Sequence, residues 1–143
     1  MITFEIAGSP KPQARPRLTK YGGVYSPKTG WYKKVKTETF KYYLKNGRKP
    51  VVDYPCTVSI KYYMPRPKSH YRTGKFSHLL KDSAPKYPIY KSDVDNLNKA
   101  ILDSIQDSKV LSDDSLVVEI YAHKQYAEYD SFTGAIIWIG EKK

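Results

Sequence analysis

The sequence predicts an α+β fold with a single domain over residues 1–143, in which helices pack on a mixed β-sheet. The length of 143 residues is typical of one domain. Several short segments alternate apolar and polar residues, which is typical of strands. Two longer segments repeat apolar residues every three or four positions, which indicates helices. The resulting order is strand, helix, strand, loop, helix, strand, strand, which favours helices packed on one sheet.

The first half of the chain contains two predicted elements joined by a basic arm. Residues 2–6 alternate apolar and polar side chains and predict a strand. Residues 8–17 carry three prolines among three basic residues, which predicts a stiff, extended arm. A pair of glycines predicts a hairpin or turn within residues 21–25. Residues 27–46 predict a helix, ended by an Asn-Gly pair that favours the conformation found after helices.

The second half contains three predicted strands, a long loop and a second helix. Residues 57–64 alternate and predict a strand, and residues 65–91 are a polar, basic loop. Loops this long inside compact domains are usually functional or mobile. Residues 116–125 and 132–139 predict two strands that pair as a hairpin. The helix between loop and strands has a small and apolar stripe that can pack on a sheet, formed by Leu97, Ala100, Ile101, Ser104 and Ile105.

The composition is strongly basic and rich in tyrosine. The chain has 25 Lys and Arg against 14 Asp and Glu, a net charge of +11, with 14 Tyr and 2 Trp. This balance favours nucleic acid over a small acidic substrate as the partner. Tyrosine can stack on bases, although we expect most of the tyrosines in the sheet and core. No membrane partner is expected, because the sequence has neither a long apolar run nor a basic amphipathic helix.

The single cysteine, Cys56, excludes an internal disulfide and fits a reducing environment. The sequence shows no signal-peptide pattern, so we expect a cytoplasmic protein. Cys56 lies in an alternating run and is interpreted as a small core residue. One cysteine and three scattered histidines do not form a recognisable zinc site. Glycine-rich phosphate motifs are absent, so no nucleotide cofactor is expected.

Residues 91–115 hold six of the 14 acidic residues: Asp93, Asp95, Asp103, Asp107, Asp113 and Asp114. Acids gathered in a basic chain suggest a cation site that faces a polyanion. Asp93 and Asp95 point to the same side only where the backbone is extended, and Pro88 favours extended geometry before them. Lys99 follows Asp95 by four residues and can share its helix face. Carboxylates of this kind suit Mg²⁺, which retains waters that phosphate can displace.

Helix capping is the alternative interpretation of these acids. Ser92 followed by Asp95 resembles a capping box, and acids favour a helix N-terminus. An Asp-Asp-Ser turn is likewise common, so Asp113 and Asp114 alone are weak evidence of a site. Capping of one helix does not, however, explain why a second acidic pair follows just before the next predicted strand.

Three blocks of the sequence resemble the RusA family of endodeoxyribonucleases, the Holliday junction resolvases common in bacterial prophages. The most specific is D-V-D-N-L-x-K-A-x-L-D-S at 93–104, followed by S-D-D-S at 112–115. G-S-P-K-P-Q-A-R-P-R at 8–17 and M-P-R-P-K-S-H at 64–70 are similar to two basic blocks of the family. The resemblance therefore spans most of the chain.

The resemblance implies a metal-dependent active site. It assigns Asp93, Asp95 and Asp114 to a divalent metal and Lys99 to an assisting role, with Asp113 as the alternate ligand. The expected cofactor is Mg²⁺, with Mn²⁺ as a substitute. We expect the arm and the 65–91 loop to bind DNA, and the loop to become ordered on the substrate. The predicted DNA-binding residues are Lys11, Arg15, Arg17, Arg66, Lys68, His70 and Arg72.

The implied activity is resolution of four-way DNA junctions by paired symmetric nicks, in DNA recombination and repair. A four-way junction has two-fold symmetry, so two nicks require two active sites and imply a homodimer. Two alternatives remain open. The protein is a non-catalytic DNA-binding protein whose acids only cap helices, or it is a nuclease for other branched DNA such as flaps and forks.

Overall fold

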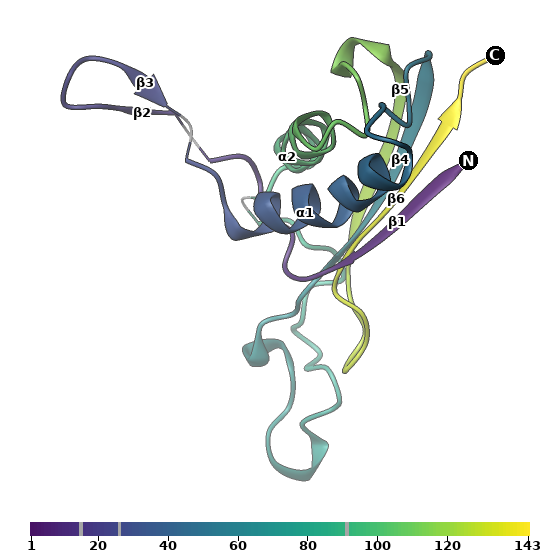
Figure 1. Ribbon diagram of the computed structural model, residues 1–143. Helices are drawn as coiled ribbons and strands as arrows, with labels where there is room; N and C mark the ends of the chain where they lie inside the picture. The colour runs from purple at the N-terminus through teal and green to yellow at the C-terminus, as the bar shows by residue number, and fades with distance from the viewer. Residues whose placement is uncertain (15, 26, 91) are drawn as a thin grey trace.

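A mixed four-stranded sheet with two helices on one face forms the body of the protein in the computed structural model, which describes residues 1–14, 16–25, 27–90 and 92–143 (Figure 1). The strands are β1 (Ile2–Ala7), β4 (Cys56–Met64), β5 (Val117–Tyr126) and β6 (Gly134–Glu141). They lie in the order β1-β6-β4-β5. β6 is antiparallel to both of its neighbours, whereas β5 is parallel to β4. The predicted α+β fold with a mixed sheet is confirmed.

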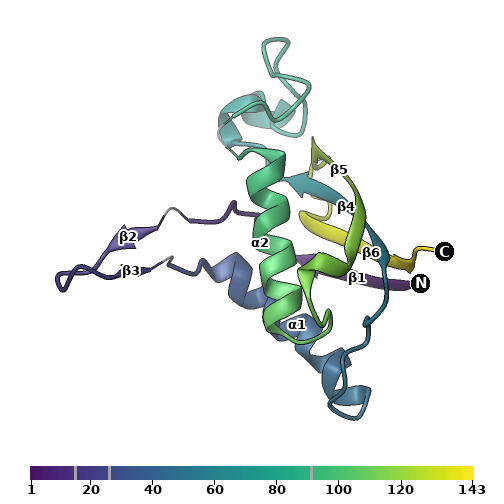
Figure 2. The same cartoon turned by 90° about the horizontal axis from the view of Figure 1, so that it is seen from above.

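Two helices cover one face of this sheet, as the view from above shows most clearly (Figure 2). α1 spans Gly30–Lys45 and α2 spans Val94–Asp107. α1 begins three residues later than predicted, because Thr29 accepts a capping hydrogen bond from the backbone of Tyr32 at 3.1 Å. The predicted end is confirmed by Gly47, whose φ of 70° is the left-handed conformation that glycine favours after a helix.

The core lies between the helices and the sheet. The predicted stripe of α2 is fully buried, from Leu97 to Ile105, and packs against alternate residues of the central strand β4. Cys56 is also buried at the start of β4, as predicted, and burial raises the pKa of its thiol. The Tyr62 hydroxyl reaches out of the sheet and donates to Asn98 Oδ1 of α2 at 2.7 Å. This bond ties the second helix to the middle of the sheet.

The hairpin predicted for the last two strands is wrong. β5 and β6 do not pair with each other, because β4 lies between them: Ile60 is opposite Ala122 on one side and Ile137 on the other. The connection of residues 127–133 is long enough to cross two strand spacings of about 4.8 Å each. β4 alternates buried residues along its whole length and takes the centre, whereas β5 is partly exposed and forms an edge.

Two segments project from the body (Figures 1 and 2). One is a ribbon of two short antiparallel strands, β2 (Arg17–Leu18) and β3 (Val24–Tyr25), which confirms the predicted hairpin. The other is the 65–90 loop, which contains the short 3-10 helices η1 (Lys68–His70) and η2 (Gly74–Phe76). Within the residues described, no helix is both long and apolar enough to cross a membrane.

Candidate active site and DNA-binding surface

Asp93 and Asp95 stand at the start of α2. Asp93 has extended backbone, with φ −66° and ψ 142°, and occupies the N-cap position, yet its side chain makes no capping hydrogen bond. Asp95 lies in the first helical turn, and both residues are exposed. The extended geometry predicted for Asp93 is confirmed, whereas the capping box predicted for Ser92 and Asp95 is wrong because the helix begins one residue later. Capping therefore does not occupy these two carboxylates.

Lys124 fixes the segment that leads into Asp93. This β5 side chain donates to the backbone carbonyl of Ser92 at 2.7 Å and lies 5.7 Å from the ring centre of Tyr90. Sequence reasoning missed this contact. The sequence feature that could have indicated it is the spacing of Lys124, which lies two residues from both Ala122 and Tyr126 and therefore on the same face of the strand as these two. The end of β5 therefore holds the start of α2 in place.

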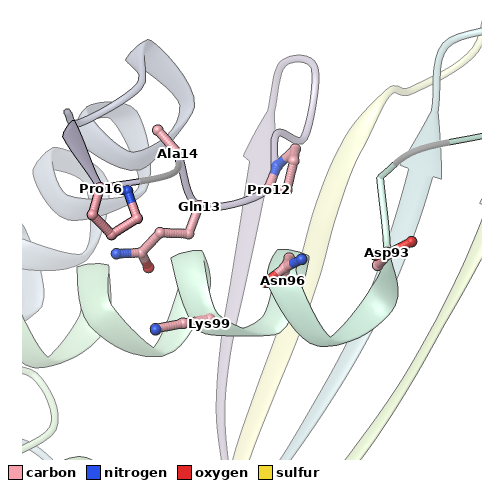
Figure 3. A pocket seen from close by; sticks show the side chains of 7 residues that line it. All are labelled: Pro12, Gln13, Ala14, Pro16, Asp93, Asn96 and Lys99. Atoms are coloured by element: carbon pink, nitrogen blue, oxygen red, sulfur yellow. The ribbon is translucent and has the colours of Figure 1, made fainter. Parts of the chain in front are cut away.

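The N-terminal arm crosses α2 beside the same residues (Figure 3). The backbone amide of Gln13 donates to the Asn96 carbonyl at 3.2 Å. Arm and helix enclose a groove of about 560 Å³, and Figure 3 shows Lys99 on the helix below the arm with Asp93 at its start. The groove is lined by Pro12, Gln13, Ala14, Pro16, Asp93, Asn96 and Lys99. An acidic and a basic residue of α2 and its N-cap therefore line one groove bordered by the basic arm.

Asp114 lies at the other end of α2. Its backbone amide donates to Gln106 Oε1 at 2.8 Å, and Gln106 belongs to the last turn of the helix. A helix rises 1.5 Å per residue, so roughly 16 Å of axis separates Asp95 from Gln106. This span far exceeds a metal–oxygen bond of about 2 Å. One chain therefore does not bring Asp114 to Asp93 and Asp95, and its described residues hold no cluster of three metal-ligating side chains.

The structure separates the roles of Asp113 and Asp114. Asp113 Oδ1 accepts from the Ser115 backbone amide at 2.8 Å and caps the short helix η3 (Asp114–Leu116). This hydrogen bond lowers the pKa of the Asp113 carboxyl. The Asp114 carboxylate is exposed in the first turn of η3 and does not cap that helix. Asp113 therefore serves the turn, while Asp114 presents its carboxylate to solvent.

Two of the predicted DNA-binding residues instead hold the base of the 65–90 loop. The Arg66 guanidinium lies 4.2 Å from the ring centre of Tyr126 and donates to the Pro85 carbonyl at 2.8 Å. The His70 ring packs edge-on against the same Tyr126, at 5.4 Å. These contacts give Arg66 and His70 a part in shaping the loop, and any direct contact with DNA stays a prediction.

The remaining predicted DNA-binding residues lie on the two projecting segments and the arm. Lys11, Arg17 and Lys68 are exposed, whereas Arg15 lies outside the described residues. Arg72 donates through Nε to the Leu80 carbonyl at 3.2 Å and keeps about half of its side chain exposed. The loop forms such hydrogen bonds within the chain, and its ordering on the substrate stays a prediction.

Exposed carboxylates and a lysine beneath a basic arm suit an enzyme that cleaves a phosphodiester backbone. Comparison with protein families gives the same class: the family model described as endodeoxyribonuclease RusA matches residues 7–133. The chain therefore belongs to the RusA family of endodeoxyribonucleases, which confirms the resemblance seen in the three sequence blocks. Membership implies an endonuclease that acts on Holliday junctions, with branched DNA as its substrate. No curated protein matches the sequence.

Proposed function

We propose that this protein is a Mg²⁺-dependent endodeoxyribonuclease that resolves four-way DNA junctions by paired symmetric nicks, in DNA recombination and repair. The observation that carries this proposal is the exposed pair Asp93 and Asp95, which stands with Lys99 beside a groove under the basic arm. Mn²⁺ is expected to substitute for Mg²⁺. The proposal also includes a cytoplasmic location, in a bacterial or phage-infected cell, and a prophage origin.

The donor groups fit a hard divalent cation. Asp93 and Asp95 offer exposed carboxylate oxygens, the ligands that Mg²⁺ prefers, and would hold the ion together. When bound, the ion would supply an activated water and offset charge on the attacked phosphate. Lys99 faces the groove and would stabilise negative charge that develops there, an effect worth roughly 2.7–4 kcal/mol for comparable electrostatic donors. Lys11 and Arg17 would bind flanking phosphates.

A homodimer paired through β5 would complete the site with Asp114. β5 is an edge strand ten residues long, with exposed apolar side chains at Val118, Ile120 and Tyr121. Long, exposed apolar edges favour pairing with another strand. Asp114 precedes the start of β5, and Lys124 near its end touches Ser92. Antiparallel pairing of two β5 strands would therefore bring Asp114 of the partner subunit toward Asp93.

Cleavage of an end-labelled four-way junction tests the function. We expect the wild-type protein to make paired symmetric nicks with Mg²⁺ and none with EDTA. Asp95→Asn removes one charge from the carboxylate pair without changing its size, so it should lower the cleavage rate at least about 100-fold. Its binding to the junction in Ca²⁺ should stay close to that of the wild type.

Other outcomes distinguish the two alternative functions. Tight binding without cleavage by the wild type, in either Mg²⁺ or Mn²⁺, would contradict the proposal and favour the non-catalytic DNA-binding protein. Faster cleavage of flaps or forks than of four-way junctions, in the same panel of labelled substrates, would identify a nuclease for other branched DNA.

A further inference from the structure

The β2–β3 ribbon exposes apolar side chains that nothing in the described chain covers. It projects away from the helices and sheet (Figures 1 and 2). Leu18 is 77% exposed, Val24 is 68% exposed and Tyr21 is 87% exposed. An isolated ribbon of two strands is only marginally stable in water, and grouped apolar side chains on a surface indicate a binding partner. The exposed side chains of the ribbon therefore indicate a surface that binds a partner.

The tip of the ribbon is a well-defined turn with Tyr21 at its outer end. The backbone amide of Thr19 donates to Gly23 at 2.7 Å, and that of Gly22 donates to Thr19 at 3.1 Å. The Gly23 amide also donates to the Thr19 hydroxyl at 2.9 Å. Gly22 has a φ of 84°, which closes the turn in a conformation that glycine adopts readily. These bonds hold the Tyr21 ring and the neighbouring Lys20 at the tip.

The two faces of the ribbon carry different chemistry. Leu18 is opposite Val24, and Arg17 is opposite Tyr25. Adjacent pairs in a ribbon point to opposite faces, so one face is apolar and the other combines a guanidinium with an aromatic ring. Arginine and tyrosine are the side chains that contact phosphates and stack on bases. A partner with both apolar faces and anionic edges fits this ribbon.

The charge around the ribbon selects a polyanion as that partner. No acidic residue occurs between Glu5 and Glu38. The same stretch contains eight basic residues: Lys11, Arg15, Arg17, Lys20, Lys28, Lys33, Lys34 and Lys36. Two copies of so cationic a segment would repel each other, which disfavours a ribbon that clasps a second subunit. DNA has both features, since its backbone is anionic and its unstacked bases are apolar.

The ribbon begins at the rim of the candidate active site. Pro16 lines the groove together with Asp93 and Lys99, and β2 starts at the next residue, Arg17. DNA bound at the groove would therefore meet the ribbon close to the cleaved phosphate. In a four-way junction, the bases that have lost a stacking neighbour lie at the branch point.

We propose that the β2–β3 ribbon recognises the branch point of the DNA. This inference rests on the proposed function and names the feature of the substrate that the ribbon binds. Tyr21 stacks on an unstacked base at the centre of the junction. Leu18 and Val24 cover the apolar surface beside it, as inserted apolar side chains do in bent DNA. Arg17 and Lys20 bind the phosphates on either side. The ribbon therefore selects branched DNA over linear duplex.

Binding of wild-type and variant proteins in Ca²⁺ tests this proposal, with a four-way junction and a linear duplex of equal length. Tyr21→Ala removes the stacking ring and should weaken junction binding about tenfold, while duplex binding changes less than twofold. Tyr21→Phe keeps the ring and is the matched control, which should bind as the wild type does. A 2-aminopurine base at the branch point should change fluorescence with wild type and Tyr21→Phe only.

Two results would overturn the proposal. One is an unchanged junction-to-duplex ratio for Tyr21→Ala, and for Leu18→Ser with Val24→Ser as a second variant of the apolar face, whether binding to both DNAs stays the same or falls equally. The other is a lower mass of these variants by light scattering without a change in that ratio, which would assign the ribbon to a second subunit. Because binding is read in Ca²⁺, a failure of wild-type cleavage in Mg²⁺ would contradict the proposed function separately.

Discussion

At the scale of single residues, the neighbouring aspartates Asp113 and Asp114 have different surroundings. Asp113 is held by the backbone amide of Ser115, whereas the next carboxylate in the chain has no such partner in the described structure. A turn needs a short acceptor at the first position, and a metal needs a carboxylate that is not already bound. The family motif assigned the metal to Asp114 and left Asp113 as the alternate ligand, and the hydrogen bond of Asp113 to Ser115 favours the same assignment.

Separate substitution of these two residues tests the distinction. Asp114→Asn should lower the cleavage rate at least about 100-fold, whereas Asp113→Asn should cleave junctions at close to the wild-type rate. The lowered pKa of Asp113 means that its hydrogen bond stabilises the fold while the carboxyl is ionised. The small difference in melting temperature between wild type and Asp113→Asn should therefore be present at neutral pH. This difference in melting temperature should disappear as the pH falls through the pKa of the Asp113 carboxyl in the folded protein.

Contacts between distant residues were the part of the site that the sequence did not reveal. Asp93, Asp95 and Lys99 are close in the chain, so a local pattern was enough to place them on one segment. Lys124 and Arg66 act on partners 19 or more residues away, at Ser92 and Pro85. Nothing in either residue's local sequence specifies such a partner, because the pairing depends on the finished fold.

At the scale of elements, α2 carries the candidate catalytic residues and depends on the sheet for its position. Alternation along residues 2–6 and 57–64 correctly predicted the strands there, because side chains of a strand alternate between its two faces. It did not predict the neighbour of each strand, which is why the order of β4, β5 and β6 was missed. Tyr62 links the two layers, and burial raises the pKa of its hydroxyl, which therefore stays a hydrogen-bond donor.

Replacement of Tyr62 by Phe tests this link between the layers. The change removes the hydrogen bond to Asn98 and leaves a partly buried acceptor unpaired, so the free energy of unfolding should fall by about 1–2 kcal/mol in urea titration. Tyr63→Phe is the matched control, because its hydroxyl has no hydrogen bond within the described structure. That variant should lose less than about 0.5 kcal/mol. Equal losses for both variants would mean that the hydroxyl of Tyr62 does not hold α2.

At the scale of the whole molecule, the distance between the two ends of α2 makes one chain insufficient for the proposed site. Asp95 and Asp114 lie near opposite ends of a helix of 14 residues. Two-fold pairing would place one end of α2 beside the opposite end of the partner's α2, because both subunits use the same surface in a two-fold dimer. The proposed homodimer with shared sites would therefore have the same two-fold symmetry as two nicks on a symmetric junction.

Mixing two inactive variants tests for shared sites. In a mixed dimer of Asp95→Asn and Asp114→Asn chains, one site combines both substitutions and the other contains neither. The mixture should therefore regain nicking of the junction, as single rather than paired cuts, although each variant alone stays inactive. The measurement is gel analysis of end-labelled strands after the subunits are mixed. Absence of any recovery, with mixed dimers demonstrated through a tag on one of the two variants, would show that each site lies within one chain.

The buried position of Cys56 has a practical consequence for following the protein on DNA. Its thiol is closed off at the start of β4, and its raised pKa keeps it protonated and therefore unreactive. It is also the only cysteine of the chain. A fluorophore attached through one new cysteine on the ribbon or the 65–90 loop can thus report from that point alone, without removal of the native thiol.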